Sequence, residues 1–266
     1  MAVRPKKSLG QHFLNDLDIA RRIADTLSPD TLPEGAGKWG SLPILEVGPG
    51  TGVLTQFLLQ TGRPLKAVEL DTESVGYLKK AYPHLDVVED DFLRLDIGKL
   101  FEGEFVLTGN YPYNISSQIF FRLLDFRERI PVCSGMLQRE VAQRLCSPPG
   151  SKVYGILSVF LQAWYDCEYL FTVDENVFTP PPKVKSGVIR LVRNSRTSLG
   201  CDERRFRTVV KTAFGQRRKT LRNSLATLLP PEGEILSSPL LKERPERLGV
   251  EEFVELTRML TPGEGK

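Results

Sequence analysis

Short apolar runs alternate with longer amphipathic stretches from Pro43 to about Val192, and this alternation limits the possible folds more than any other feature of the chain. It predicts strands separated by helices, which assemble into a mainly parallel sheet with helices on both faces. The predicted helices span residues 52–60, 72–81 and 116–126. The predicted strands span residues 43–47, 65–70, 85–89, 105–108, 132–137, 169–173 and 188–192. We therefore expect an α/β fold with a seven-stranded sheet, in which the last strands can run antiparallel.

The pattern changes after a short polar segment at residues 194–200. Beyond it, residues 202–214, 217–228 and 250–260 show helical periodicity, interrupted by Gly215 and by two prolines. We expect two domains, with residues 1–195 forming the α/β domain and residues 196–266 a small all-helical domain. Upstream of the boundary, Thr179-Pro-Pro-Pro-Lys183 predicts a rigid extended loop, because proline lacks the N–H that helices and central strands need.

The cysteines and histidines give no support for a fold held by disulfide bonds or by a metal ion. The four cysteines include no C-x-x-C pair and there are two histidines, so we expect neither a disulfide framework nor a metal site. The basic N-terminus is not followed by an apolar run, and no run approaches the roughly 18 residues of a membrane span. We expect a soluble protein of the bacterial cytoplasm, since a motif that starts at Lys7 leaves no room for a transit peptide.

Positive charge is concentrated near the C-terminus. Residues 1–195 carry a net charge of −1 and residues 196–266 a net charge of +4. Residues 204–222 alone hold eight basic side chains and no acidic one. Such a cluster is typical of a surface that binds a polyanion such as nucleic acid, although a solvated helix face has the same composition.

A glycine-rich turn, Leu45-Glu-Val-Gly-Pro-Gly-Thr-Gly52, follows the first predicted strand and leads into a helix. Glycine at positions such as Gly48 and Gly50 lets a ligand approach the backbone, and the helix start offers free N–H groups. The turn does not match the dinucleotide pattern, because the third glycine of that pattern falls on Val53. Taken alone, the motif is equally consistent with a structural tight turn.

Polar residues follow the next three predicted strands. Glu69 ends the second strand, Asp91 the third and Asn110 the fourth. An acid about 20 residues after the glycines is suited to a ribose diol, and a second acid can accept from an adenine amine. Either acid alone is also typical of a surface carboxylate, but the strand ends of an α/β sheet meet at one crevice. The ordered set therefore predicts a binding site for a nucleoside-containing ligand.

The fourth strand ends in Asn110-Tyr-Pro-Tyr113. Adenine N6 is a poor nucleophile because its lone pair is delocalised, so its methylation requires acceptors that hold the N–H groups rather than a strong base. The Asn110 side-chain carbonyl and the Tyr111 backbone carbonyl are candidate acceptors, and Pro112 fixes the turn. Tyr113 can stack on an extruded base. Without the upstream pattern, a simple turn after a strand would explain these residues.

Several motifs resemble a known family. Asn-x-Pro-Tyr after a glycine turn is similar to the signature of N6-adenine methyltransferases. Three further segments resemble the small-subunit ribosomal RNA adenine N6,N6-dimethyltransferases: Lys7-Ser-Leu-Gly-Gln-His-Phe-Leu14, Phe178-Thr-Pro-Pro-Pro-Lys-Val184 and Phe214-Gly-Gln-Arg-Arg-Lys-Thr-Leu-Arg-Asn-Ser-Leu225. The resemblance covers about residues 6–254 and implies a Rossmann-like, seven-stranded S-adenosylmethionine-dependent methyltransferase sheet.

The resemblance also implies an activity and its partners. Members of this family methylate N6 of two adjacent adenosines in a hairpin near the 3′ end of small-subunit (16S) rRNA. We therefore expect S-adenosylmethionine as the cofactor, rRNA or the assembling 30S particle as the partner, and a role in ribosome biogenesis. We expect a monomer.

The resemblance assigns roles to individual residues. His12, where many members have Asn, and Leu14 would contact the methionine end of the cofactor. Gly48 and Gly50 would lie under the cofactor, Glu69 would bind its ribose and Asp91 its adenine amine. Asn110 would serve cofactor and target. The residues expected to contact RNA are Phe178, which would wall the target-base pocket, and the basic helix residues Arg217, Arg218, Lys219 and Arg222.

One position departs from the family pattern. Tyr111 stands where the family usually has Leu. Since the backbone carbonyl is the expected acceptor, we expect methylation to be retained. A bulkier side chain would, however, reduce the room for a monomethylated intermediate.

Three alternative functions share part of this pattern. A large-subunit (23S) rRNA adenine methylase of the antibiotic-resistance type has the same catalytic half. A mainly non-catalytic ribosome-assembly factor could use the same basic helical domain. A DNA adenine methylase is disfavoured because the sequence shows no separate base-reading domain. The three-proline loop and the Gln-Arg-Arg-Lys segment favour the small-subunit enzyme.

Overall fold

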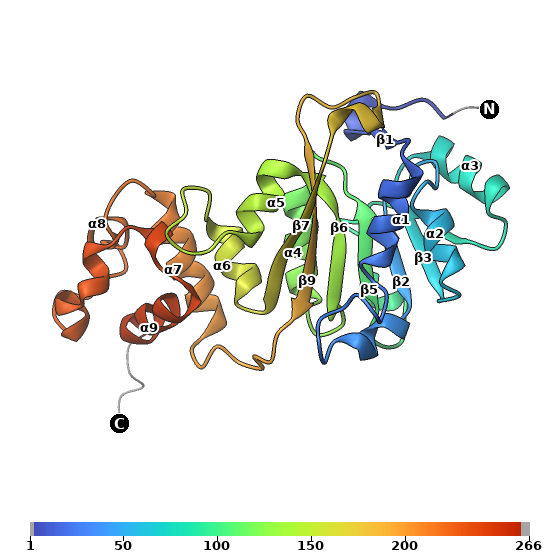
Figure 1. Ribbon diagram of the computed structural model, residues 1–266. Helices are drawn as coiled ribbons and strands as arrows, with labels where there is room; N and C mark the ends of the chain where they lie inside the picture. Colours follow the sequence, from blue (N-terminus) through green and yellow to red (C-terminus); the bar gives the residue numbers. More distant parts are fainter. Residues whose placement is uncertain (1–2, 262–266) are drawn as a thin grey trace. The chain divides into compact units, whose positions relative to one another are not determined.

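A computed structural model describes residues 3–261 of the chain (Figure 1). Its internal contacts divide the chain into two compact units. The first unit combines Met1–Gln143 with Asp166–Arg193, and the second combines Arg144–Tyr165 with Asn194–Lys266.

The first unit is built on a seven-stranded sheet with the strand order β4-β3-β2-β5-β6-β9-β7. Its strands are β2 (Ile44–Val47), β3 (Leu65–Glu69), β4 (Asp86–Glu89), β5 (Val106–Asn110), β6 (Val132–Gln138), β7 (Tyr165–Val173) and β9 (Ser186–Arg193). The pairs from β4 to β6 are parallel, whereas β9 runs antiparallel to β6. The predicted seven-stranded α/β fold and its antiparallel final part are confirmed.

Helices cover this sheet, as its apolar strands require. The helices of the first unit are α1 (Leu17–Asp25), α2 (Thr55–Gln60), α3 (Thr72–Ala81), α4 (Ser116–Asp125) and the start of α5 (Arg139–Cys146), with short 3₁₀ turns η1 (Lys7–Leu9), η2 (Gly37–Ser41), η3 (Ile97–Lys99) and η4 (Glu175–Val177). All four residues of β2 are buried, which is typical of a central strand covered on both faces. One core cluster joins Ile44, Val106 and Met136 of the sheet to apolar residues of α1, α2 and α3.

The strand order places a topological switch beside β2. The chain proceeds from β2 outward through β3 to β4 and then returns to the other side of β2 as β5. At such a switch point, the loops that follow the two adjacent strands run in opposite directions, and ligands bind in the crevice between these loops. The glycine turn after β2 and the Asn110 segment after β5 therefore meet at this crevice.

A second sheet in this unit has two strands, one from the N-terminal segment and one from the segment before the three prolines. β1 (Phe13–Leu14) pairs antiparallel with β8 (Phe178–Thr179), so that Phe13 is opposite Thr179 and Leu14 opposite Phe178. The sequence does not predict this pair, because strands of two residues have no periodicity to detect. The pairing holds the N-terminal segment against the start of the three-proline loop.

The second unit is helical. Its elements are α6 (Ile156–Gln162), α7 (Glu203–Gly215), α8 (Leu221–Ser224) and α9 (Val250–Leu260), with 3₁₀ turns η5 (Glu234–Ser237), η6 (Pro239–Lys242) and η7 (Pro245–Arg247). Phe160 of α6 and Phe206 of α7 have ring centroids 6.2 Å apart. This packing explains why residues 144–165 belong to the C-terminal unit, although the sequence analysis placed the domain boundary at 195 alone.

The predicted helix at residues 217–228 is wrong in its extent. In the structure α8 is limited to Leu221–Ser224, and Arg217, Arg218 and Lys219 lie in the turn that precedes it. The Lys219 N–H donates to the Gln216 carbonyl at 2.8 Å, and Thr220 is extended. Buried side chains begin only at Leu221, so nothing packs residues 217–219 into a helix.

Candidate active site

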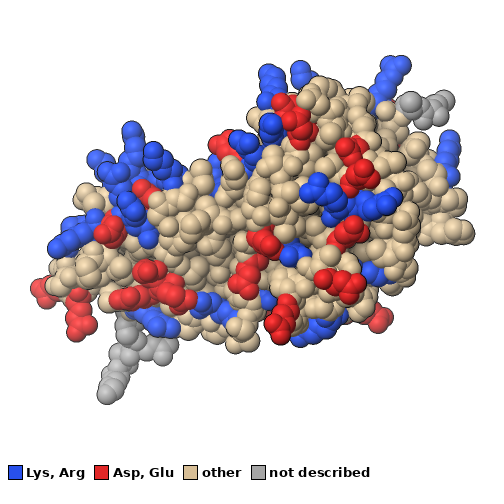
Figure 2. All heavy atoms as spheres, viewed as in Figure 1, with Lys and Arg blue, Asp and Glu red and all other residues tan. Residues whose placement is uncertain are grey.

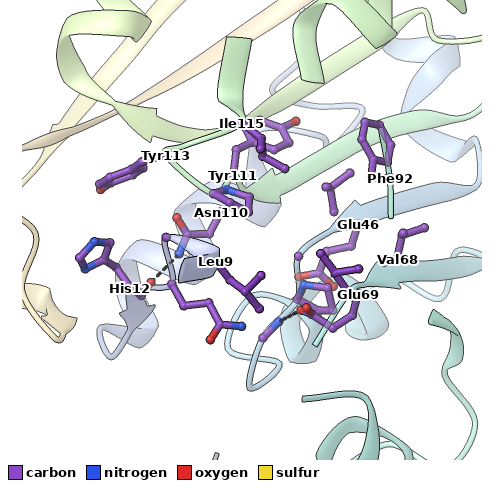
Figure 3. A pocket seen from close by; sticks show the side chains of 18 of the residues that line it. Leu9, His12, Glu46, Val68, Glu69, Phe92, Asn110, Tyr111, Tyr113 and Ile115 are labelled. Carbon is purple, nitrogen blue, oxygen red and sulfur yellow. Dashed lines mark hydrogen bonds between the residues drawn. The ribbon is translucent and has the colours of Figure 1, made fainter. Parts of the chain in front are cut away.

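A pocket opens in the first unit at the carboxyl ends of β2, β3, β4 and β5 (Figure 3). It is lined by residues 9–14, 46–51, 68–70, 90–93 and 110–115, together with Ile23 of α1 and with Val53 and Leu54 just before α2. The pocket therefore brings together every residue that the sequence analysis assigned to the cofactor or to catalysis: His12, Leu14, Gly48, Gly50, Glu69, Asp91, Asn110, Tyr111, Pro112 and Tyr113.

The glycine turn has a backbone that side chains would not tolerate. Gly48 has φ 66° and Gly50 has φ 58°, both in the left-handed region that favours glycine. A Cβ atom on Gly50 would stand 2.9 Å from the Phe13 ring, so the turn also needs glycine to pass under the N-terminal segment. The turn thus keeps its backbone close to the pocket.

Glu69 ties this turn to the end of β3. Its carboxylate accepts hydrogen bonds from the Gly50 N–H at 3.0 Å and from the Asp71 N–H at 2.9 Å. Burial raises the pKa of Glu69, and these two backbone donors oppose that shift. The carboxylate is therefore held in one orientation beneath the pocket, where it can accept from ligand hydroxyl groups.

Asp91 is more exposed. It lies beyond β4, and its carboxylate accepts from the Leu93 N–H at 2.9 Å and pairs with the Arg94 guanidinium at 3.5 Å. Its position on the pocket wall agrees with an acceptor for an amine of the ligand.

Glu46 is a pocket residue that the sequence analysis missed. It lies in β2, is 1% exposed, and accepts a hydrogen bond from the Thr55 hydroxyl at 2.7 Å. Burial, with a contribution from neighbouring Glu69, raises the pKa of Glu46 to about 8. A signal was present, because Glu46 is the single acid in an otherwise apolar predicted strand.

The Asn110 side chain links β5 to the N-terminal segment. Its Nδ2 donates to the backbone carbonyl of His12 at 3.2 Å, as the dashed line in Figure 3 shows. In this view Asn110 lies between Glu69 at one end of the pocket and Tyr113 with His12 at the other. The amide therefore stands between the regions assigned to cofactor and target.

Tyr113 and His12 form an aromatic wall. Their ring centroids are 5.4 Å apart with an interplanar angle of 31°. The Tyr113 hydroxyl shares a hydrogen bond with the Ser186 hydroxyl, and His12 Nδ1 donates to the Pro180 carbonyl at 2.7 Å. Both rings are thus fixed in place and present π surfaces suited to a flat base.

The Tyr111 ring does not enter this wall. The residue is 1% exposed, and its ring points away from His12 and Tyr113 into the core (Figure 3). The ring meets Phe120 of α4 edge-on at a centroid distance of 5.7 Å. The expected loss of room for a methylated intermediate therefore has no support in the position of the ring.

The residues expected to contact RNA lie elsewhere. Phe178 is 3% exposed, belongs to the core cluster of the first unit and is absent from the described pocket lining. Arg218, Lys219 and Arg222 are exposed in the second unit, and Figure 2 shows Lys and Arg gathered there around α8 and the end of α7. Arg217 and Arg222 are both partly engaged, since the first donates to the Lys152 carbonyl and the second to the Leu236 carbonyl.

Within residues 3–261, His, Cys, Asp and Glu form no cluster that could hold a metal ion. In the same part of the chain, no helix is long and apolar enough to cross a membrane.

The fold and the pocket define an S-adenosylmethionine-dependent methyltransferase. The glycine turn after β2, the fixed carboxylate at the end of β3 and the acid beyond β4 all line this one pocket. A profile described as "Ribosomal RNA adenine dimethylase" matches residues 2–258. The chain belongs to the ribosomal RNA adenine dimethylase family, as the sequence motifs predicted.

Curated relatives support this assignment over nearly the whole chain. A protein of Parabacteroides distasonis is 62% identical over 257 residues, which are 96% of this chain and 93% of the relative. A protein of Porphyromonas gingivalis is 60% identical over 264 residues, covering 98% and 99% of the two chains. Both are named "Ribosomal RNA small subunit methyltransferase A".

Solved structures share the fold. A dimethyladenosine transferase from Plasmodium falciparum superposes with a TM-score of 0.74 at 24% identity, covering 92% of this chain and 96% of that one. The 23S rRNA methyltransferase ErmE gives a TM-score of 0.66 at 25% identity, covering 93% and 99%. The predictions of a methyltransferase enzyme that uses S-adenosylmethionine and acts on ribosomal RNA are confirmed.

Proposed function

We propose that this protein methylates N6 of two adjacent adenosines in the 3′-terminal hairpin of small-subunit rRNA. The proposal rests on one observation: the residues predicted to bind the cofactor and the Asn110–Tyr113 segment line the same pocket. The names of the curated relatives favour the small subunit as the substrate.

The pocket residues would hold the cofactor in a defined order. His12 and Leu14 would contact its methionine end, and Gly48 and Gly50 would lie beneath it. Glu69, fixed by the Gly50 and Asp71 N–H groups, would accept from the ribose hydroxyls. Asp91 would accept from the adenine amine. When bound, the cofactor supplies an electrophilic methyl group.

The end of β5 would prepare the target amine. The Asn110 side-chain carbonyl and the Tyr111 backbone carbonyl would each accept one N–H of adenine N6, which favours a pyramidal nitrogen with its lone pair free. As positive charge develops on the nitrogen, both carbonyl dipoles stabilise it. Tyr113 would stack on the base and hold it in line, so the pocket contributes mainly orientation.

The second unit would contribute RNA affinity. Arg218, Lys219 and Arg222 are exposed cations suited to phosphate contacts, and Arg217 lies beside them. Phosphate contacts carry little sequence information, so the adenosines would be selected by RNA shape and by the ease of extruding them. Phe178 would support the target-base pocket from its place in β8. We further propose that the protein works as a monomer on the assembling 30S particle in the bacterial cytoplasm.

The test is to incubate the protein with labelled S-adenosylmethionine and undermethylated 30S subunits, with 50S subunits as the control, and to map labelled adenosines by mass spectrometry. The proposal predicts N6,N6-dimethyladenosine in the 3′ hairpin of the small subunit. Label confined to 50S subunits would instead indicate the 23S-type activity that the name of ErmE describes. Tight 30S binding without label would indicate an assembly factor.

A further inference from the structure

We infer that the Tyr111 phenol is an anchor that positions the Asn110–Tyr113 segment by fastening it to β6. The inference rests on the proposed function, in which the backbone carbonyl of the same residue accepts from the target amine. It adds a role for the side chain, which the family resemblance does not supply because Leu is usual at this position. Tyr111 would thus be a positioning residue through its ring and hydroxyl.

The anchor consists of contacts between the phenol and β6. The Tyr111 hydroxyl donates to the Ser134 carbonyl at 3.3 Å and lies 3.2 Å from the Cys133 Sγ atom. The Tyr111 N–H donates to the Met136 carbonyl at 2.8 Å. Backbone and side chain therefore hold the same residue to the same strand at two points.

Two glycines make the space that the ring occupies. A Cβ atom on Gly135 would stand 2.6 Å from Cε2 of Tyr111, and one on Gly109 would stand 3.2 Å from Cε1. Each glycine also lies close to a neighbouring strand. The Cβ atom on Gly135 would be 2.4 Å from the Gly109 carbonyl oxygen, and the one on Gly109 would be 2.5 Å from the Val47 carbonyl oxygen. The Tyr111 ring thus packs directly against the backbone of the two glycines and has little freedom to shift.

The strand that receives the phenol is itself held firmly. The Ser134 hydroxyl donates to the Ile189 carbonyl of β9 at 2.9 Å and lies 2.7 Å from the Thr26 hydroxyl. Burial raises the pKa of Tyr111 well above its ordinary value and that of Cys133 to about 12, so both groups keep their protons. The neutral phenol can therefore donate to the Ser134 carbonyl of a strand that these bonds hold in place.

Loss of the hydroxyl should affect the second methyl transfer more than the first. An unmethylated amine has two N–H groups, which two acceptors can hold. A monomethylated amine has one N–H left and relies more on the exact placement of the remaining acceptor. A loosened segment would therefore let the monomethylated product accumulate.

The experiment compares Tyr111→Phe with wild type and with Tyr154→Phe, a change at a buried tyrosine of the second unit. The readouts are the rates of the first and second transfer on 30S subunits, cofactor affinity by calorimetry, and amide hydrogen exchange of residues 110–115. For Tyr111→Phe we expect faster exchange in this segment, unchanged cofactor affinity, and a second transfer slowed about 10-fold relative to the first. Tyr154→Phe should leave the ratio of the two rates and the exchange of this segment unchanged.

The inference is overturned if Tyr111→Phe matches wild type in either the exchange of residues 110–115 or the ratio of the two rates. It is also overturned if Tyr154→Phe changes both readouts equally, since the effect would then be general destabilisation. A wild-type protein that labels no 30S adenosine would contradict the proposed function instead, and the exchange measurement alone would then decide whether the anchor exists.

Discussion

Two buried carboxyl groups, Glu46 and Glu69, lie on adjacent parallel strands beneath the pocket, and their surroundings differ. Glu69 accepts from two backbone N–H groups, which favour its charged form, whereas Glu46 has one hydroxyl donor. Sequence spacing identified Glu69 because its position relative to the glycines is characteristic. It did not identify Glu46, although a single acid in an apolar predicted strand was a signal, because spacing does not show that this side chain lines the pocket. The Tyr111 ring was likewise unpredictable, because its space depends on Gly135 of a neighbouring strand.

Glu46 should make stability depend on pH. The pKa of Glu46 is raised from 4.5 in the unfolded chain to about 8 in the fold, so the folded state binds the proton more tightly. The free energy of unfolding is therefore expected to fall as pH rises from about 4.5 to about 8. Urea unfolding of wild type and Glu46→Gln over this range measures the effect. The substitution should flatten the dependence, and parallel curves would rule out Glu46 as its source.

Glu69→Gln should weaken cofactor binding. The substitution removes the charge that would accept from the ribose hydroxyls, and a charged hydrogen bond is worth enough to lower affinity roughly 10- to 100-fold. Titration calorimetry with S-adenosylmethionine measures this directly. An exposed acid of the same unit, Glu102→Gln, serves as the control. An unchanged affinity would remove Glu69 from the cofactor site.

At the scale of elements, the sequence predicted those with strong periodicity and missed those set by distant contacts. The strands from β2 to β6, together with α3 and α9, follow apolar patterns that each element determines locally. The β1–β8 pair and the place of α6 in the second unit depend on partners far away in the chain. The turn at residues 217–219 was predicted to be helical because Arg and Lys favour helices. No side chain there is buried, so no packing stabilises a helix.

The glycine turn offers a matched pair of substitutions. Gly50 and Gly62 have φ angles of 58° and 69°, but a Cβ atom meets the Phe13 ring only at Gly50, since nothing lies within 4 Å of it at Gly62. Either change to Ala should cost about 1–2 kcal/mol of stability through backbone strain. Only Gly50→Ala should also weaken S-adenosylmethionine binding. Equal cofactor affinities in the two variants, measured alongside thermal unfolding, would show that the turn does not form the site.

At the scale of the whole molecule, each unit has its own chemistry. The first unit carries the pocket, and the second carries the basic turn before α8. Charge counting placed the excess of basic residues after residue 196, and the basic turn before α8 lies in that part of the chain. It could not predict that residues 144–165 join the second unit, because their apolar side chains would suit either core.

The basic turn should set the salt dependence of RNA binding. Replacing Arg218 and Lys219 together by Ala is expected to weaken binding and to reduce the slope of log affinity against log salt by about one for each phosphate group that the variant no longer neutralises. Replacing Lys79 and Lys80 of α3, which are also exposed, is the control for general charge. Binding to the isolated hairpin across a salt series measures both. Identical slopes for the two double variants would contradict a specific phosphate surface.

Single-turnover transfer by Asn110 variants shows whether the end of β5 prepares adenine N6 for methylation. The measurement uses saturating S-adenosylmethionine and 30S subunits, with wild type, Asn110→Ala and Asn110→Asp. Asn110→Ala loses an acceptor and should be slowed about 100- to 1000-fold, whereas Asn110→Asp keeps an oxygen and should be slowed less. Near-wild-type transfer by Asn110→Ala, in a variant that still binds the RNA, would contradict the account.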